Sequence, residues 1–199
     1  MIITVASFKG GVAKTTTAIH LASYLQTKAD TLLIDGDPNR SASNWAKRGE
    51  LPFKVVDERL AAKFAPKYGQ GHIVIDTQAR PEKEDLEALA EGCDLLVLPT
   101  TPDALSLDAL MQTVDALKAL GANQYRILIT RVPPKPRKDA QEAREMLLEA
   151  GLPTFTGSIR DAVAFQKAAL AGVPVNKVSD SRAKMAWKDY QTVGKEILP

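Results

Sequence analysis

Hydrophobic residues along this 199-residue chain follow two patterns that alternate from one end to the other. The first is a short run of consecutive apolar residues, rich in Ile, Val and Leu, which is typical of strands buried on both faces. Such runs cover residues 2–7, 31–35, 72–76, 94–99 and 125–130. Since strands of this kind need helices as cover on both sides, the pattern predicts an α/β fold with a mostly parallel sheet.

The second pattern is helical spacing of apolar residues between these runs. In 15–28, for example, Ile19, Leu21, Ala22 and Leu25 lie on or near one face. The predicted helices cover 15–28, 41–48, 82–90, 104–120, 139–150, 162–171 and 181–198. No linker or internal repeat divides the chain, and its length suffices for one sizeable core. We therefore expect residues 1–199 to form a single domain.

Composition excludes several classes of protein. Disorder does not fit a chain with 45% hydrophobic and 25% charged residues, and the apolar runs are strand-sized, far below the ~20 residues of a membrane span. The N-terminus begins directly with a strand pattern, so we expect no secretory signal. The lone Cys93 cannot form an internal disulfide, which fits the cytoplasm, and His20 and His72 are too far apart in sequence to predict a metal cluster. The net charge of +2 leaves any nucleic-acid binding to local patches.

Four of the apolar runs end in a polar or special residue, namely Ser7, Asp35, Asp76 and Pro99. The carboxyl ends of parallel strands lie along one edge of the sheet, where such folds bind ligands. The sequence therefore predicts that the loops after these residues meet in one crevice.

The strongest chemical signal is the segment 9–16, Lys-Gly-Gly-Val-Ala-Lys-Thr-Thr, between a predicted strand and a predicted helix. Glycines let several backbone N–H groups point at one anion, and a helix N-terminus adds partial positive charge. In such a phosphate loop Lys14 reaches the β- and γ-phosphates, and the hydroxyl of Thr15 coordinates Mg²⁺. The strict P-loop pattern is not met, because Phe8 and Ala13 occupy its two glycine positions. We expect Ala13 to enter the first helical turn without strain.

This segment resembles the deviant Walker A motif of the ParA/MinD family of P-loop ATPases, in which glycine is usual at the position of Ala13. The resemblance implies a P-loop NTPase fold, ATP and Mg²⁺ as cofactors, and an ATP-sandwich homodimer. Lys9 matches the family's signature lysine, which reaches the phosphates of the partner's nucleotide, whereas taken alone it would be a solvated loop residue. The expected nucleotide-binding residues of the loop are Gly10, Gly11, Val12, Ala13, Lys14, Thr15 and Thr16, with Lys9 and Lys14 as the catalytic cations.

The second run is followed by Asp-Gly-Asp-Pro-Asn at 35–39, which is similar to the family's D-x-D-P-Q switch with Asn39 in place of glutamine. The resemblance implies that Asp37 positions or activates the attacking water and that Asp35 supports the metal shell. A turn that caps the helix starting near Ser41 is a compatible alternative.

The third run, 72–76, ends in Asp76, as a Walker B strand does. Asp76 would hold a water ligand of Mg²⁺, so that Thr15, Asp35 and Asp76 form the expected metal-binding set. Residues 76–81 are a candidate second switch. By resemblance, 99–102 matches the family's P-x-x-P stretch, Arg131 and Pro133 lie near the adenine ring, and 159–161 lies near the nucleotide or the dimer edge.

The resemblance further implies a function in positioning cargo. ATP-driven dimerisation would enable nonspecific DNA binding, and a ParB-like or cargo-adaptor protein would stimulate a weak ATPase, releasing it from the nucleoid. The cargo would be a plasmid, a chromosome region or a protein compartment. Ile2 already belongs to the first strand, so we expect no N-terminal helix-turn-helix domain and no sequence-specific DNA binding.

Basic residues gather at 131–138 and in the C-terminal third. Each alone fits an ordinary solvated face, but a dimer could present them as a DNA-binding stripe. The C-terminal candidates are Lys167, Lys177, Arg182, Lys184, Lys188 and Lys195. A MinD-like membrane-associated ATPase is the alternative, but the tail 191–199 lacks aromatic residues and ends in proline, so membrane binding is not expected. A metabolic ligase would need additional substrate loops, and a metal-cluster ATPase would need paired cysteines.

Overall fold

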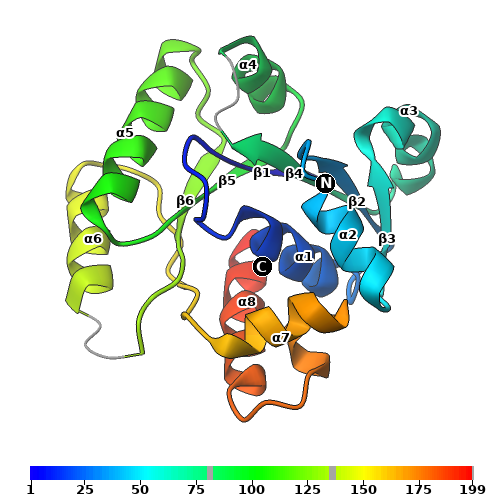
Figure 1. The fold of residues 1–199 in the computed structure, drawn as a ribbon. Coiled ribbons are helices and arrows are strands. Elements are labelled where there is room, and N and C mark those ends of the chain that lie inside the picture. The colour runs from blue at the N-terminus through cyan, green and yellow to red at the C-terminus, as the bar shows by residue number, and fades with distance from the viewer. Residues whose placement is uncertain (80–82, 135–137, 199) are drawn as a thin grey trace.

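Six parallel strands form one sheet at the centre of the protein (Figure 1). The structure is a computed structural model that describes residues 1–79, 83–134 and 138–198, apart from the side chains at 83 and 84. The strand order is β3-β2-β4-β1-β5-β6, and every pairing is parallel, which confirms the predicted fold class. The strands are β1 (Ile2–Ser7), β2 (Thr31–Gly36), β3 (Lys54–Asp57), β4 (His72–Ala79), β5 (Leu95–Thr100) and β6 (Tyr125–Ile129).

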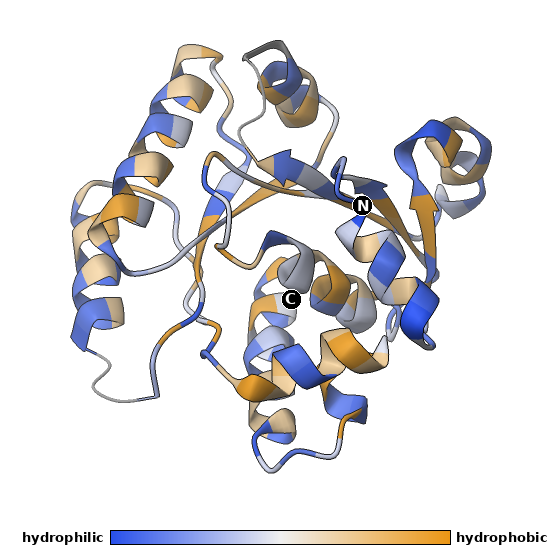
Figure 2. Ribbon diagram, in the orientation of Figure 1, coloured by the Kyte–Doolittle hydropathy of each residue, from blue (hydrophilic) through white to orange (hydrophobic). Residues whose placement is uncertain are grey.

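Helices cover both faces of this sheet, since alternate side chains of each strand point to opposite sides. One face packs against α1 (Lys14–Leu25), α2 (Ser41–Arg48), α7 (Val163–Ala171) and α8 (Ala183–Ile197). The other packs against α4 (Lys83–Glu91), α5 (Ala104–Ala119) and α6 (Lys138–Glu149), with α3 (Ala61–Phe64) beside the β3 edge. Figure 2 shows the apolar strands and the hydrophobic inner stripes of the helices. Leu32 and Leu33 illustrate the alternation, because they enter different cores.

The predicted helices are present with small shifts at their ends. The helix expected over 15–28 begins at Lys14 and ends at Leu25, where residues 26–28 turn toward β2. The one expected over 82–90 is observed as α4, and residue 82 lies outside the described residues. Strand β3 and the short helices that follow it were not predicted, because Val55 and Val56 are the only apolar residues in that strand.

The C-terminal helix α8 is part of the core rather than a free tail. Its apolar residues Tyr190, Val193 and Ile197 are buried against the rest of the protein. Gly194 faces Tyr24 of α1 so closely that a Cβ there would lie 2.2 Å from the Tyr24 ring, so glycine is required. The apolar face of α8 is therefore already covered. None of the helices in the described ranges is long and apolar enough to span a bilayer.

Candidate functional site

The carboxyl edge of the sheet gathers the predicted chemical groups. Strand β4 lies between β1 and β2, and Asp35 of β2 is the direct register partner of Asp76 of β4. The loop that follows β1 joins it to α1 and contains the glycines of the phosphate-loop motif. The prediction that separate strand ends converge in one crevice is thus confirmed for the phosphate loop, Asp35 and Asp76.

The phosphate loop contains two residues with positive φ. Gly11 has φ +81°, and Ala13, the N-cap of α1, has φ 65° and ψ 34°. The expectation that Ala13 enters the helix without strain was wrong, because it adopts the left-handed conformation that favours glycine. A Cβ at Gly10 or Gly11 would meet no atom within 4 Å, so only the φ of Gly11 demands glycine.

Strand β6 and the residues after it hold the loop in place. The side chain of Val12 is buried, and its carbonyl accepts a 3.0 Å hydrogen bond from the hydroxyl of Thr130. Arg131 donates through Nη1 to the carbonyl of Gly11 at 3.2 Å. Val12 therefore anchors the loop with its side chain and carbonyl, while the exposed Gly10 and Gly11 leave the outer side of the loop open to a ligand.

Lys14 and Asp76 form the buried electrostatic centre of the site. Lys14 is 8% exposed and donates to the carbonyl of Lys9 at 3.5 Å, and burial lowers its pKa against the attraction of Asp76 and Asp37. Asp76 is fully buried, and this burial raises its pKa to about 7, while the hydroxyl of Thr15 and the ammonium of Lys14 oppose the rise. An unpaired buried carboxyl of this kind is costly unless a ligand completes it.

The donor set at this point fits Mg²⁺. Neither carboxylate oxygen of Asp76 accepts a hydrogen bond of regular geometry from the described residues. The hydroxyl of Thr15 lies beside it, and hard oxygen donors are the ligands that Mg²⁺ prefers. Nowhere in the described part of the chain do three His, Cys, Asp or Glu side chains gather as a metal cage.

Asp35 and Asp37 organise the loop between β2 and α2. Asp35 is fully buried, and its two oxygens accept the backbone N–H groups of Asp37 at 3.3 Å and Ser43 at 2.8 Å. The first turn of α2 is thus bonded by Asp35 and not by the Asp-Pro turn that the sequence offered as an alternative, and the role of Asp35 in the metal shell stays a prediction. Oδ1 of Asp37 accepts both the backbone and the side-chain N–H of Asn39, at 2.8 and 2.9 Å. Oδ2 accepts none from the described residues, which leaves it available to a water.

Arg40 was missed by the sequence analysis, although it fixes the position of this loop. It has φ 52°, donates to the carbonyl of Asp35 at 2.6 Å, and pairs with Asp57 at 3.3 Å and Glu58 at 3.2 Å. These partners belong to β3 and the turn after it, so Arg40 couples the Asp37 loop to the edge of the sheet. Only the clustering of opposite charges at 57–59 hinted at this contact.

Lys9 lies at the rim of the site and is held within its own chain. Its ammonium contacts Oδ1 of Asp103 at 3.2 Å and donates to Oγ of Ser106 at 2.7 Å. Asp103 caps α5 by accepting the N–H of Ser106, and it also accepts the hydroxyl of Thr101, the largest cause of its lowered pKa. The Lys9 side chain remains 32% exposed, whereas Lys14 is buried, so one loop presents two lysines to different surroundings.

A cavity of about 380 Å³ adjoins the phosphate loop. Arg131 lines it and Pro133 does not, and the placement of these two residues at the adenine ring stays a prediction. Arg160 in the cavity wall pairs with Asp189 through contacts of 2.6 and 2.7 Å. The predicted segment 159–161 is thus beside the loop. Sequence reasoning missed several lining residues, for which the sequence offers no motif. The full lining is Gly11, Ala13, Thr16, Arg131, Ile159, Arg160, Asp161, Ala162, Phe165, Gln166, Ala169 and Tyr190.

The parallel sheet, the glycine-bearing loop before α1, the buried Lys14 and the unpaired Asp76 define a P-loop-type nucleotide-binding protein. Comparison with known proteins makes this more specific. Residues 3–175 match the model of the CobQ/CobB/MinD/ParA nucleotide binding domain, and the chain belongs to this family. The family resemblance noted in the phosphate loop is thereby confirmed.

Similar proteins agree along nearly the whole chain. Maintenance of carboxysome distribution protein A from Gloeobacter kilaueensis is 38% identical over 201 residues, covering 98% of this chain and 93% of that protein. Among solved structures, an ATP complex of a Cyanothece McdA variant has a TM-score of 0.77 at 19% identity, covering 99% of this chain and 95% of that one. The septum site-determining protein MinD from Pyrococcus horikoshii, solved with Mg-ADP, has a TM-score of 0.74 at 18% identity, covering 98% and 95%.

Proposed function

We propose that this protein is an ATPase of the ParA type that uses Mg²⁺ and ATP to form a dimer and positions a cargo in the cell. The observation that carries the proposal is the pair of lysines on one loop. Lys14 is buried beside Asp76 and Asp37, where it would face the nucleotide of its own subunit, while Lys9 lies at the exposed rim. A cation at the rim can reach a nucleotide held by a second subunit.

Within one subunit the residues divide the chemistry among them. The N–H groups of the loop and the N-terminus of α1 would bind the phosphates, and Lys14 would stabilise the charge that develops on them. Mg²⁺, held by Thr15 and Asp76, supplies charge neutralisation when bound. Asp37 would orient the attacking water through Oδ2, since Asn39 fixes its other oxygen.

The proposed dimer face includes the surface around Lys9. Leu105, which lies in sequence between the Lys9 partners Asp103 and Ser106, is 72% exposed. A second subunit placed face to face would cover Leu105 and bring Lys9 to the opposite phosphates. Two identical chains would then complete each other's sites, and residues 1–199 would act as one ATPase domain.

The cargo and the DNA surface on which it is positioned are proposed by similarity. The relative from Gloeobacter is named for carboxysome distribution, so a protein compartment is the class of cargo we propose first, before a plasmid or a chromosome region. The dimer would bind DNA nonspecifically on the cytoplasmic nucleoid. A ParB-like or cargo-adaptor protein would accelerate a weak intrinsic ATPase and release the dimer from DNA.

The mass of the protein in solution tests the dimer directly. With ATP and Mg²⁺, the Asp37→Ala variant should be trapped as a dimer in light scattering, with little turnover. Lys9→Ala should bind nucleotide but stay monomeric, Lys14→Ala should lose nucleotide binding, and Lys118→Ala, on the exposed far end of α5, should behave like the unaltered protein. A monomeric Asp37→Ala protein in saturating ATP would refute the proposal.

A DNA-binding assay tests the proposed switch. A gel shift should require ATP and should weaken steeply as salt rises, because phosphate contacts release counterions. Equal binding in ADP and ATP would rule out the switch. Co-sedimentation of the ATP form with anionic vesicles would instead favour the membrane alternative, against which the buried apolar face of α8 argues.

A further inference from the structure

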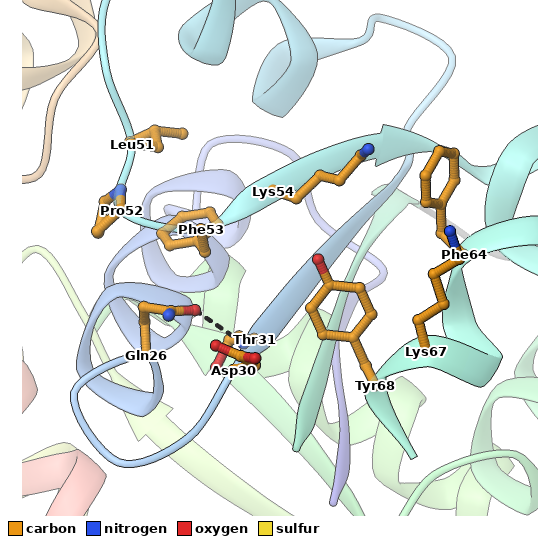
Figure 3. Close-up of a pocket in the computed structure, with 10 residues that line it drawn as sticks. All are labelled: Gln26, Asp30, Thr31, Leu51, Pro52, Phe53, Lys54, Phe64, Lys67 and Tyr68. Carbon is orange, nitrogen blue, oxygen red and sulfur yellow. Dashed lines mark hydrogen bonds between the residues drawn. The ribbon is translucent and has the colours of Figure 1, made fainter. Parts of the chain in front are cut away.

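A second cavity, of about 570 Å³, opens at the edge of the sheet opposite the phosphate loop (Figure 3). It lies between the end of α1, the starts of β2 and β3, and the short helices after β3. Six-residue strands separate the two edges of the sheet by roughly 20 Å. The lining residues are Gln26, Asp30, Thr31, Leu51, Pro52, Phe53, Lys54, Phe64, Lys67 and Tyr68.

Three lysine ammonium groups surround one aromatic ring at the rim of this cavity. The ring of Phe64 has the Nζ atoms of Lys54, Lys67 and Lys63 at 3.8, 5.6 and 5.8 Å from its centroid. Figure 3 shows the ammonium groups of Lys54 and Lys67 close to Phe64, with the hydroxyl of Tyr68 turned toward the cavity. Aromatic faces attract cations, which explains how exposed lysines are held together here. We call Lys54, Lys63, Phe64, Lys67 and Tyr68 the Phe64 patch.

The positive charge of the Phe64 patch is not neutralised locally. Within the described residues, no carboxylate oxygen lies within 4 Å of these three ammonium groups. The acids Asp57 and Glu58 are paired with Arg40, and Asp57 also with Arg59. Asp30 lines the same cavity but lies farther than 4 Å from each of the three ammonium groups. Like charges held so close together repel one another, so the arrangement calls for an anionic ligand.

We propose that the Phe64 patch binds the phosphate backbone of duplex DNA, an inference that rests on the proposed function and locates its DNA contact. Each ammonium lies within 6 Å of the ring centroid, so no two are farther apart than about 12 Å. A span of this size allows the lysines to contact neighbouring phosphates of a DNA strand, which follow one another at about 3.4 Å along the helix axis. Lysines on flexible stems contact phosphates without reading bases, which matches sequence-independent binding.

The location of the patch explains why dimerisation would enable binding. Since the proposed dimer face lies at the carboxyl edge, it would leave the Phe64 patch free in each subunit. A single patch offers three phosphate contacts, and a dimer offers two linked patches, whose combined affinity exceeds that of either alone. The ATP dependence then comes from avidity and requires no rearrangement of the patch.

The exposed lysines of α8 are the rival surface and supply a matched control. Lys184, Lys188 and Lys195 are exposed on α8. Replacing all three by glutamine removes as much positive charge as replacing the three lysines of the patch. The test compares Lys54→Gln/Lys63→Gln/Lys67→Gln with Lys184→Gln/Lys188→Gln/Lys195→Gln, both in the ATP-trapped Asp37→Ala background. The probe is a fluorescent duplex of arbitrary sequence and two helical turns, measured by anisotropy, with dimer mass and thermal unfolding recorded alongside.

The expected result is that DNA binding by the patch variant depends less on salt than binding by the reference dimer does. The six contacts of the two linked patches contribute about 5.4 to the slope of log affinity against log salt, so raising salt from about 50 to about 200 mM should weaken the reference dimer about 1,800-fold more than the patch variant. The α8 variant should keep the reference slope. Poly-glutamate should compete poorly with the duplex at equal charge concentration.

Several outcomes overturn the inference. If the patch variant dimerises and binds the duplex with an unchanged slope, the patch is not the contact. An equal loss in both triple variants would mean that binding follows net charge alone. Equal competition by poly-glutamate would assign the patch to an acidic protein. If the reference dimer forms but binds no duplex, both this inference and the proposed DNA binding fail, whereas failure to dimerise refutes the proposed ATP switch itself.

Discussion

The left-handed conformation of Ala13 allows a quantitative test of the phosphate loop. With φ 65° and ψ 34°, its Cβ crowds the carbonyl oxygen of its own residue, at a cost of about 1–2 kcal/mol. Glycine removes that cost but makes the unfolded chain more flexible, which costs about 0.4–1 kcal/mol. Ala13→Gly should therefore raise the free energy of unfolding by about 0.5–1 kcal/mol.

The neighbouring glycines supply matched controls. Gly11→Ala places a Cβ in open space but at φ +81°, so it should destabilise the protein by about 1 kcal/mol through backbone strain alone. Gly10→Ala also meets open space, and its φ lies outside the left-handed region, so it should be neutral or stabilising by up to about 1 kcal/mol. Urea unfolding without nucleotide, with the m-value checked for constancy, measures all three changes.

The opposite signs of these changes make the test discriminating. If Ala13→Gly lowers the free energy of unfolding, the methyl group of Ala13 must contribute more by packing than its backbone loses by strain. If Gly11→Ala is as harmless as Gly10→Ala, the loop conformation described here is not the one the protein adopts in solution. The first result would refute the predicted gain in stability, and the second would refute the assignment of strain to this loop.

Three further predictions concern charges at the site and in the core. Asp103→Asn should weaken the contact that holds Lys9 within its own chain, an exposed ion pair worth about 0.2–1 kcal/mol. Lys9 is then freer to reach the second subunit, so ATP-dependent dimerisation should tighten about 1.5- to 5-fold in sedimentation equilibrium. Weaker dimerisation would contradict this. Burial lowers the pKa of His20 to about 4. As pH falls below 6.5, the unfolded chain therefore takes up a proton at His20 that the folded protein does not, and the free energy of unfolding decreases. The difference in unfolding free energy between the protein and His20→Gln should therefore fall by about 3 kcal/mol from pH 7 to pH 4, and a constant difference would exclude the shift. Burial raises the pKa of Asp76 to about 7, so its carboxylate destabilises the fold as pH rises; without nucleotide or Mg²⁺, Asp76→Asn should stabilise at pH 8 by a few kcal/mol, a gain that vanishes near pH 4. If the stabilisation by Asp76→Asn does not depend on pH, the ionised Asp76 carboxylate does not destabilise the fold.

The sequence was sufficient for five of the six strands and for the convergence of the chemical groups at their ends. Buried parallel strands appear as apolar runs, and their carboxyl ends share one edge, so Asp35 and Asp76 had to lie close together. Strand β3 escaped prediction because it lies at the edge of the sheet and needs only Val55 and Val56 to be apolar. Solvent on its open side permits Lys54, which is typical of edge strands.

The contacts that tune the site could not be predicted from sequence. Lys9 and Asp103 are 94 positions apart, and nothing in either local pattern indicates that α5 begins beside the phosphate loop. The cavity next to that loop depends on how α7 packs against α1, and so Phe165 and Gln166 carried no sequence signal. Backbone conformation was equally hidden, because alanine is the best helix former and its presence before Lys14 favoured a helical interpretation.

Strain at the site is distributed over three loops that meet at the same edge of the sheet. Ala13, Arg40 and Arg131 are the non-glycine residues at positive φ within the described ranges, and each follows or precedes a strand or helix at the phosphate-loop edge. At about 1–2 kcal/mol each, their strain amounts to a substantial part of the net stability of a domain. Arg40 and Arg131 offset it with side-chain hydrogen bonds to Asp35 and Gly11. Ala13 has no such side chain, and for this reason the loop that would bind the phosphates is the place where glycine should stabilise the protein without removing a contact.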